Sequence, residues 1–167
     1  MTERILAIDP SIQSLHAAYA WGIREGCRVR VQEVGRLKFG GANVSERLMN
    51  LGVQVQVLMQ RTNPRKVAVE LADDWMQTKR NQRPMRKLYL ATGVIMGAAK
   101  SEDPTRDVRG VSVRDWIGQR KHEDMLHDTR LTLAWPESRC LTDDEVMAGG
   151  LLLWFAETLG IEERSKA

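Results

Sequence analysis

The chain has 167 residues, of which 43% are apolar and 28% charged, and its formal net charge is +3. This length fits one domain, so we expect residues 1–167 to form a single domain with a buried core. No apolar run reaches the roughly 18 residues that span a bilayer. The first 15 residues already contain an acidic strand, which argues against a secretory signal. Two cysteines indicate neither a disulfide framework nor a zinc site, and they favour a cytoplasmic protein.

The first third of the chain predicts three successive strands. They cover ERILAID (3–9), SLHAAYAWGI (14–23) and RVRVQEVGRLKF (28–39), with turn signals at Asp9-Pro10 and Glu25-Gly26. Gly40-Gly41 ends this meander. A helix over about 45–61 follows, capped by Asn43 or Ser45, although the alternating stretch GVQVQVLM inside it leaves a strand open as the alternative.

The remaining elements alternate between strand and helix. We expect strands over 67–71 and 108–113, and helices over 84–100, 114–133 and 143–160. Pro84 fits the first turn of its helix. The order β-β-β-α-β-α-β-α-α predicts an α/β protein with a mixed five-stranded sheet and helices on both faces.

Acidic residues stand at three places where apolar segments continue or begin. Asp9 ends the first strand, Glu70 lies inside VAVEL, and Asp143, Asp144 and Glu145 open the last helix. Carboxylates beside a core are costly unless they are paired or bind a cation. Oxygen ligands suit Mg²⁺ or Mn²⁺, and two such ions are a known device for phosphodiester hydrolysis.

Structural explanations stay open for some of these acids. Asp9 could cap the turn that follows its strand. Asp143 or Asp144 could cap the last helix, and we expect Glu145 to be a partner of the helix dipole rather than a ligand.

A cationic segment follows the strand that carries Glu70. Residues 79–87, KRNQRPMRK, contain no acid and five bases, namely Lys79, Arg80, Arg83, Arg86 and Lys87. Such a cluster suits a polyanion, and a solvated loop is the alternative. Trp75, just before it, either stacks on a base or packs into the core.

Several segments together resemble one family. ILAIDPS, VAVE followed by NQRPMRKLYLATGVIMGAA, VRDWIGQRKHEDM and TDDEVMAGGLLLW resemble the RuvC-type Holliday-junction resolvases of bacteria and their phages. The resemblance covers about residues 4–160 and implies the RNase H-like nuclease fold. It also implies a homodimer that cuts four-way DNA junctions with two Mg²⁺ or Mn²⁺ ions in each site.

The resemblance also implies roles for individual residues. Asp9 would bridge both metals, Glu70 and Asp144 would each hold one, and Asp143 could share that work. Lys121 matches the family's lysine near the active site and is a catalytic candidate, with Arg114 and Arg120 as weaker candidates for phosphate contact. The segment with Lys79 to Lys87, together with Trp75, would face the junction.

One position departs from the family pattern. Aligned on Ala148, Met147 falls where the family has a second aspartate one turn after Asp144. A thioether is a poor ligand for Mg²⁺. The alternative function is therefore a junction-binding protein with weak or lost cleavage. An actin-like ATPase is disfavoured because no Gly-rich phosphate loop follows Asp9, and a ribonuclease H acting on RNA–DNA hybrids fits the segments less well.

Overall fold

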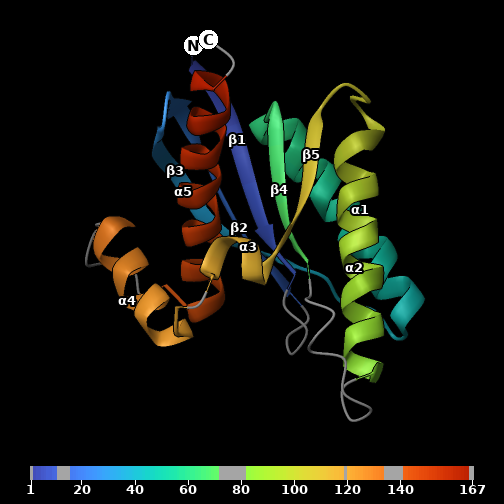
Figure 1. Ribbon diagram of the computed structural model, residues 1–167. Coiled ribbons are helices and arrows are strands. Elements are labelled where there is room, and N and C mark those ends of the chain that lie inside the picture. The colour runs from blue at the N-terminus through green and yellow to red at the C-terminus, as the bar shows by residue number, and fades with distance from the viewer. Residues whose placement is uncertain (1, 11–15, 72–81, 119, 134–140, 166–167) are drawn as a thin grey trace.

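Figure 1 shows the computed structural model, which describes residues 2–10, 16–71, 82–118, 120–133 and 141–165. For residues 82–84 the description covers the backbone alone. Lys79, Arg80 and Trp75 therefore lie outside the described residues, as does the side chain of Arg83.

One mixed sheet of five strands runs through the molecule, in the order β3-β2-β1-β4-β5. Its strands are β1 (Thr2–Asp9), β2 (His16–Glu25), β3 (Arg28–Lys38), β4 (Lys66–Leu71) and β5 (Asp107–Ser112). The first three form an antiparallel meander, turned at Gly26 with a φ of 61°. β4 lies parallel to β1, and β5 lies parallel to β4. The predicted mixed five-stranded sheet is confirmed.

The helices are α1 (Val44–Thr62), α2 (Gln82–Ser101), α3 (Val113–Ile117), α4 (His122–Leu133) and α5 (Asp143–Arg164). Asn43 caps α1 by accepting from the backbone N–H of Glu46, so the helical interpretation of this segment is right. The prediction of one helix over 114–133 is wrong. Gly118, with a φ of 65°, ends α3, because left-handed backbone cannot continue a right-handed helix. None of the described helices is long and apolar enough to cross a membrane.

Two apolar cores lie on opposite faces of the sheet. Alternation along β1 places Ile5 and Ala7 against α5, while Leu6 and Ile8 face α1 and α2. All four side chains are fully buried, which explains why the strand is a continuous apolar run. Figure 1 shows α5 and α1/α2 on the two sides of the sheet.

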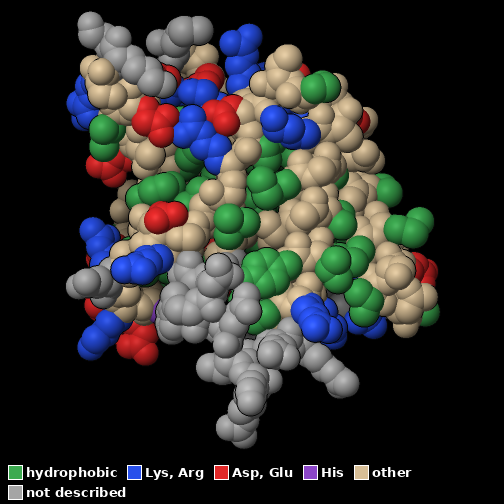
Figure 2. Space-filling model, turned by 45° about the vertical axis from the view of Figure 1, so that its right-hand side comes forward, with side chains coloured by type: hydrophobic (Ala, Val, Ile, Leu, Met, Phe, Trp, Pro, Cys, Tyr) green, Lys and Arg blue, Asp and Glu red, His purple; other side chains and the backbone are tan. Residues whose placement is uncertain are grey.

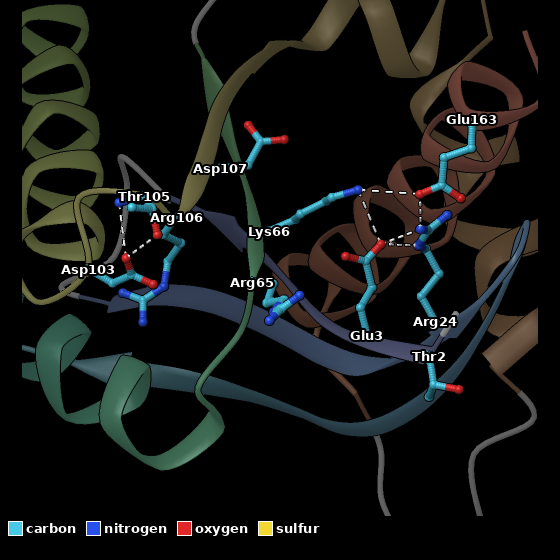
Figure 3. Close-up of a pocket in the computed structure, with 10 residues that line it drawn as sticks. All are labelled: Thr2, Glu3, Arg24, Arg65, Lys66, Asp103, Thr105, Arg106, Asp107 and Glu163. Atoms are coloured by element: carbon cyan, nitrogen blue, oxygen red, sulfur yellow. Dashed lines mark hydrogen bonds and ion pairs between the residues drawn. The ribbon is translucent and has the colours of Figure 1, made fainter. Parts of the chain in front are cut away.

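The two ends of the sheet differ in the polar groups they carry. At the upper end in Figure 1, where both termini lie, a cavity of about 630 Å³ is lined by an ionic cluster. There Arg24 donates to Glu3 and Glu163, and Lys66 points towards the same two carboxylates (Figure 3). The lower end carries the carboxyl ends of β1 and β4 and the beginning of α5.

Candidate active site

Three carboxylates meet at the lower end of the sheet. Asp9 is the last residue of β1, and Glu70 follows Val69, which is paired with Ile8 in the parallel ladder between β1 and β4. Asp9 and Glu70 therefore lie at the same end of the sheet and on the face that α5 covers. Asp144, in the first turn of α5, is the third.

The three groups act on one another electrostatically. The pKa of Asp9 is raised well above its usual value, first by burial and then by the charges of Glu70 and Asp144. Burial and like charges both disfavour an ionised carboxylate. The ionised form of Asp9 is thus disfavoured by its surroundings, and a bound cation would stabilise that form.

Glu70 and Asp144, the outer carboxylates of the site, are each hydrogen-bonded to a ring N–H. The indole Nε1 of Trp116 donates to Oε2 of Glu70 at 2.9 Å. The imidazole Nε2 of His16 lies 3.1 Å from Oδ2 of Asp144. An ionised aspartate only accepts hydrogen bonds, so Nε2 of His16 carries the proton in this contact.

The donor set fits a hard divalent cation by its chemistry. Three carboxylates supply oxygen ligands, which Mg²⁺ and Mn²⁺ prefer. Within the described ranges, no three His, Cys, Asp or Glu side chains are already arranged to hold a metal ion. The fit therefore rests on residue type, mutual charge and location, and Asp9, Glu70 and Asp144 are the residues that would hold the ion.

The other two acids of the α5 first turn make different contacts. Asp143 forms an ion pair with Arg130 at 2.6 Å, and its side chain is 64% exposed. Glu145 is buried, and its Oε2 accepts from both the backbone N–H and the hydroxyl of Thr142, the N-cap residue. This capping box explains Glu145 as a partner of the helix terminus. Thr142, rather than Asp143 or Asp144, caps the helix.

Met147 belongs to the apolar core between α5 and the sheet. It is 6% exposed and clusters with Ala148 and Leu151 on the same face of the helix. The position where the resemblance places a second aspartate is thus occupied by a packed hydrophobic side chain, one turn after Asp144.

The cationic candidates that the structure describes lie on the surface. Arg86 and Lys87 are exposed in the first half of α2, Arg114 is exposed in α3, and Arg120 and Lys121 are exposed just before α4. The guanidinium of Arg120 lies 3.6 Å from the sulfur of Met125.

Sequence reasoning missed two residues that bond to the carboxylates. Trp116 is 5% exposed, and its bond to Glu70 was not predicted. His16 was included in the second strand without a role. The antiparallel return of that strand could have indicated a role for His16. It pairs Ala18 with Asp9 and so brings residue 16 to the end of the sheet where Asp9 lies.

Comparison with known proteins identifies similar folds but no similar sequence. No protein-family model and no curated protein matches the chain. The structure resembles Thermus thermophilus RuvC with a TM-score of 0.74, 20% identity and coverage of 95% of this chain and 96% of that one. A second structure, T. thermophilus RuvC in complex with a Holliday junction substrate, gives the same TM-score and coverage at 19% identity.

A more distant resolvase shares the same architecture. The yeast mitochondrial Holliday junction resolvase Ydc2 matches with a TM-score of 0.66 and 11% identity, over 98% of this chain and 84% of that one. The resemblance inferred from the sequence is thus confirmed for the fold, over nearly the whole chain. This protein has the RNase H-like fold of the RuvC-type Holliday-junction resolvases.

Proposed function

We propose that this chain is a structure-selective endonuclease that resolves four-way DNA junctions by two-metal-ion phosphodiester hydrolysis, as a homodimer. The observation that carries the proposal is the carboxylate site of Asp9, Glu70 and Asp144 at the lower end of a RuvC-type fold. One of the solved structures that share this fold is named as a Holliday junction resolvase, and another is RuvC in complex with a Holliday junction substrate.

In this proposal the three carboxylates hold divalent cations at the sheet edge. Bound cations of this kind activate water and neutralise the charge that develops on the scissile phosphate. The charges of both Glu70 and Asp144 act on Asp9, which suits a ligand shared by both ions. Lys121 would add a positive charge beside the phosphate, and such preorganised charge lowers the barrier to hydrolysis.

Exposed cations would position the DNA without reading its sequence. Arg86 and Lys87 continue the segment that begins at Lys79, and Arg114 and Arg120 follow β5. Neutralising Arg86 and Lys87 to glutamine should make junction affinity less salt-dependent, with a loss of about 0.9 in the log–log slope for each phosphate contact removed. Arg28 and Arg30, exposed on β3, are the matched control pair. An unchanged slope would exclude Arg86 and Lys87 from the DNA surface.

A dimer is proposed because paired nicks need two sites related by two-fold symmetry. Figure 2 looks onto the side of the molecule where α2 lies, and hydrophobic side chains spread over the middle of this face. Exposed large apolar residues of α1 and α2 include Met49, Val53, Val57, Tyr89 and Leu90. Exposed apolar side chains on two helices that pack together suit an interface. Light scattering should show a dimer at micromolar concentration, and a monomer would contradict this part.

The deciding experiment uses a labelled four-way junction with Mg²⁺, with Mn²⁺ and with EDTA. We expect paired nicks with either metal and intact DNA with EDTA. A linear duplex and an RNA–DNA hybrid of matched sequence serve as competing substrates. Cutting of the hybrid in preference to the junction would replace the proposal with a ribonuclease activity.

The packed Met147 favours one second candidate, a junction-binding protein with weak or lost cleavage. The same experiment distinguishes the two functions. Tight and selective junction binding with uncut DNA in both metals would establish the binding protein.

A further inference from the structure

Two side chains outside the carboxylate site bond to its outer members. Trp116 comes from α3 and donates to Glu70 at 2.9 Å, while His16 comes from β2 and contacts Asp144 at 3.1 Å. Elsewhere in the described chain, Glu3, Glu33 and Glu163 lie within 4.0 Å of an arginine. In the two contacts described at the site, Glu70 accepts from an indole, which carries no charge, and Asp144 from an imidazole.

The direction of the Trp116 N–H is fixed by packing. The indole is 5% exposed and belongs to the core between the sheet and α5. Gly150 of α5 lies so close that a Cβ there would stand 3.2 Å from Cζ3 of the indole and 2.8 Å from the hydroxyl of Thr129 of α4. Three helices therefore meet around Trp116, and its N–H points towards Glu70.

The direction of His16 is fixed by strand register. His16 pairs with Lys38 of β3, and it precedes by two residues Ala18, the partner of Asp9. Because side chains two apart share a face, His16 points to the same side as Ala18 and Ala20, which contact the α5 core. The imidazole is 19% exposed and ends at the first turn of α5.

We propose that Trp116 and His16 are positioning residues, which fix the directions in which Glu70 and Asp144 present their oxygens towards Asp9. This inference rests on the proposed function, since it concerns the cation that the three carboxylates would hold. Groups that hydrogen-bond to metal-ligating carboxylates set their orientation, and losing one typically weakens metal binding about 10–100-fold.

The test measures Mn²⁺ affinity by calorimetry in the absence of DNA. Trp116→Phe keeps an aromatic ring but removes the N–H, and His16→Leu removes the imidazole donor. Each should weaken Mn²⁺ binding about 10–100-fold. His16→Gln keeps an N–H at a similar reach and should bind within about threefold of the original protein. Trp154→Phe is the matched control, because Trp154 is a partly buried indole that packs against the core to which Trp116 belongs.

A second readout separates positioning from general damage to the fold. Junction cleavage by Trp116→Phe and His16→Leu should fall at low Mn²⁺ and recover at high Mn²⁺, whereas a misfolded variant would not recover. Unchanged Mn²⁺ affinity in both variants, with the original protein binding metal and cutting junctions, would overturn the positioning role alone. Equal losses in His16→Gln and His16→Leu would overturn it for His16. An original protein that neither binds Mn²⁺ nor cuts would overturn the proposed function as well.

Discussion

The two ends of the sheet handle buried charge in opposite ways. At the upper end the Arg24 side chain is 1% exposed, and it donates to Glu3 at 2.6 Å, to Gly26 O at 2.7 Å and to Glu163. At the lower end Asp9 faces two more acids, and its pKa is raised rather than lowered. In the upper cluster the carboxylates are paired with basic side chains of the same chain. In the lower cluster the carboxylates repel one another, and a bound cation would offset that repulsion.

This difference separates structural charge from functional charge. A buried arginine with its carboxylates joins β2, β1 and the last turns of α5. Like charges gathered at one edge oppose folding, so their presence is better explained by a ligand than by stability. The predictions below test whether the two clusters respond in opposite directions.

The largest expected effect is that of Asp9→Asn on cleavage. The substitution removes a carboxylate from the centre of the site, and the loss of several kcal/mol of metal assistance corresponds to about a thousand-fold in rate. In EDTA the same variant should melt at a higher temperature than the original protein, because a repelled, buried charge is gone. A junction assay measures the cleavage rate, and thermal denaturation in EDTA measures the melting temperature.

Exposed Glu25 provides the control for this substitution, as Glu25→Gln should change neither value. A lower melting temperature for Asp9→Asn in EDTA would mean that Asp9 is a structural residue, and the contrast between the two ends would fail.

Arg24→Met should lower the stability of the fold and leave cleavage unchanged. Removing one partner of a buried ion pair costs about 3–5 kcal/mol, and we expect the lower part of this range because Lys66 still reaches Glu3 at 3.2 Å. For a chain of this size that is a fall of about 6–12 °C in melting temperature. Cleavage at a temperature where the variant is folded should be unchanged. Arg28→Met, at an exposed position of β3, is the control, and a similar fall there would contradict the prediction.

Met147→Asp should make the lower end more acidic and more dependent on metal. Residues 144 and 147 lie on one face of α5, so a carboxylate at 147 would add an oxygen ligand one turn behind Asp144. We expect Mg²⁺-dependent cleavage to rise about tenfold, which corresponds to about 1.4 kcal/mol. Stability in EDTA should fall, because Met147 now packs in the core, and Mn²⁺ should restore it. Unchanged activity and metal preference would leave Met147 as ordinary packing.

The strands and their order were predictable because each signal was local. Three kinds of signal indicate the strands and the opening meander: alternation in residues 28–39, apolar runs at 5–8 and 67–69, and turn residues between them. The parallel pairing of β4 with β1 and β5 was not predicted. The helix break at Gly118 was not predicted. A single glycine is tolerated inside many helices, and its positive φ is a property of the folded backbone.

The site was predictable only in part, for a related reason. An acid in or at the end of a buried strand is visible in the sequence, which is why Asp9 and Glu70 were chosen. Asp144 was chosen because it opens an apolar helix. The bonds from Trp116 and His16 span 46 and 128 residues along the chain and depend on strand register and helix packing. No local pattern contains that information.

The smallest expected effect is on the pH dependence of stability in EDTA. The folded-state pKa of Asp9 is raised by burial, Glu70 and Asp144, so its stabilising protonation is complete below the ordinary carboxyl pKa and is lost as the pH rises through the folded value. Glu163 has the opposite effect on the pH dependence of stability. The hydrogen bond from Arg24 lowers the pKa of Glu163, so its contribution to stability is lost as the pH falls. One proton changes stability by at most about 1.4 kcal/mol per pH unit.

The difference in melting temperature between Asp9→Asn and the original protein should therefore shrink as the pH falls from 7 towards 4, by about 2–4 °C for each kcal/mol. In Glu163→Gln the same Asp9 difference should persist, since the two groups lie at opposite ends of the sheet and should act independently. A difference that is constant across this range would show that Asp9 is not the group that links protonation to folding at the lower end.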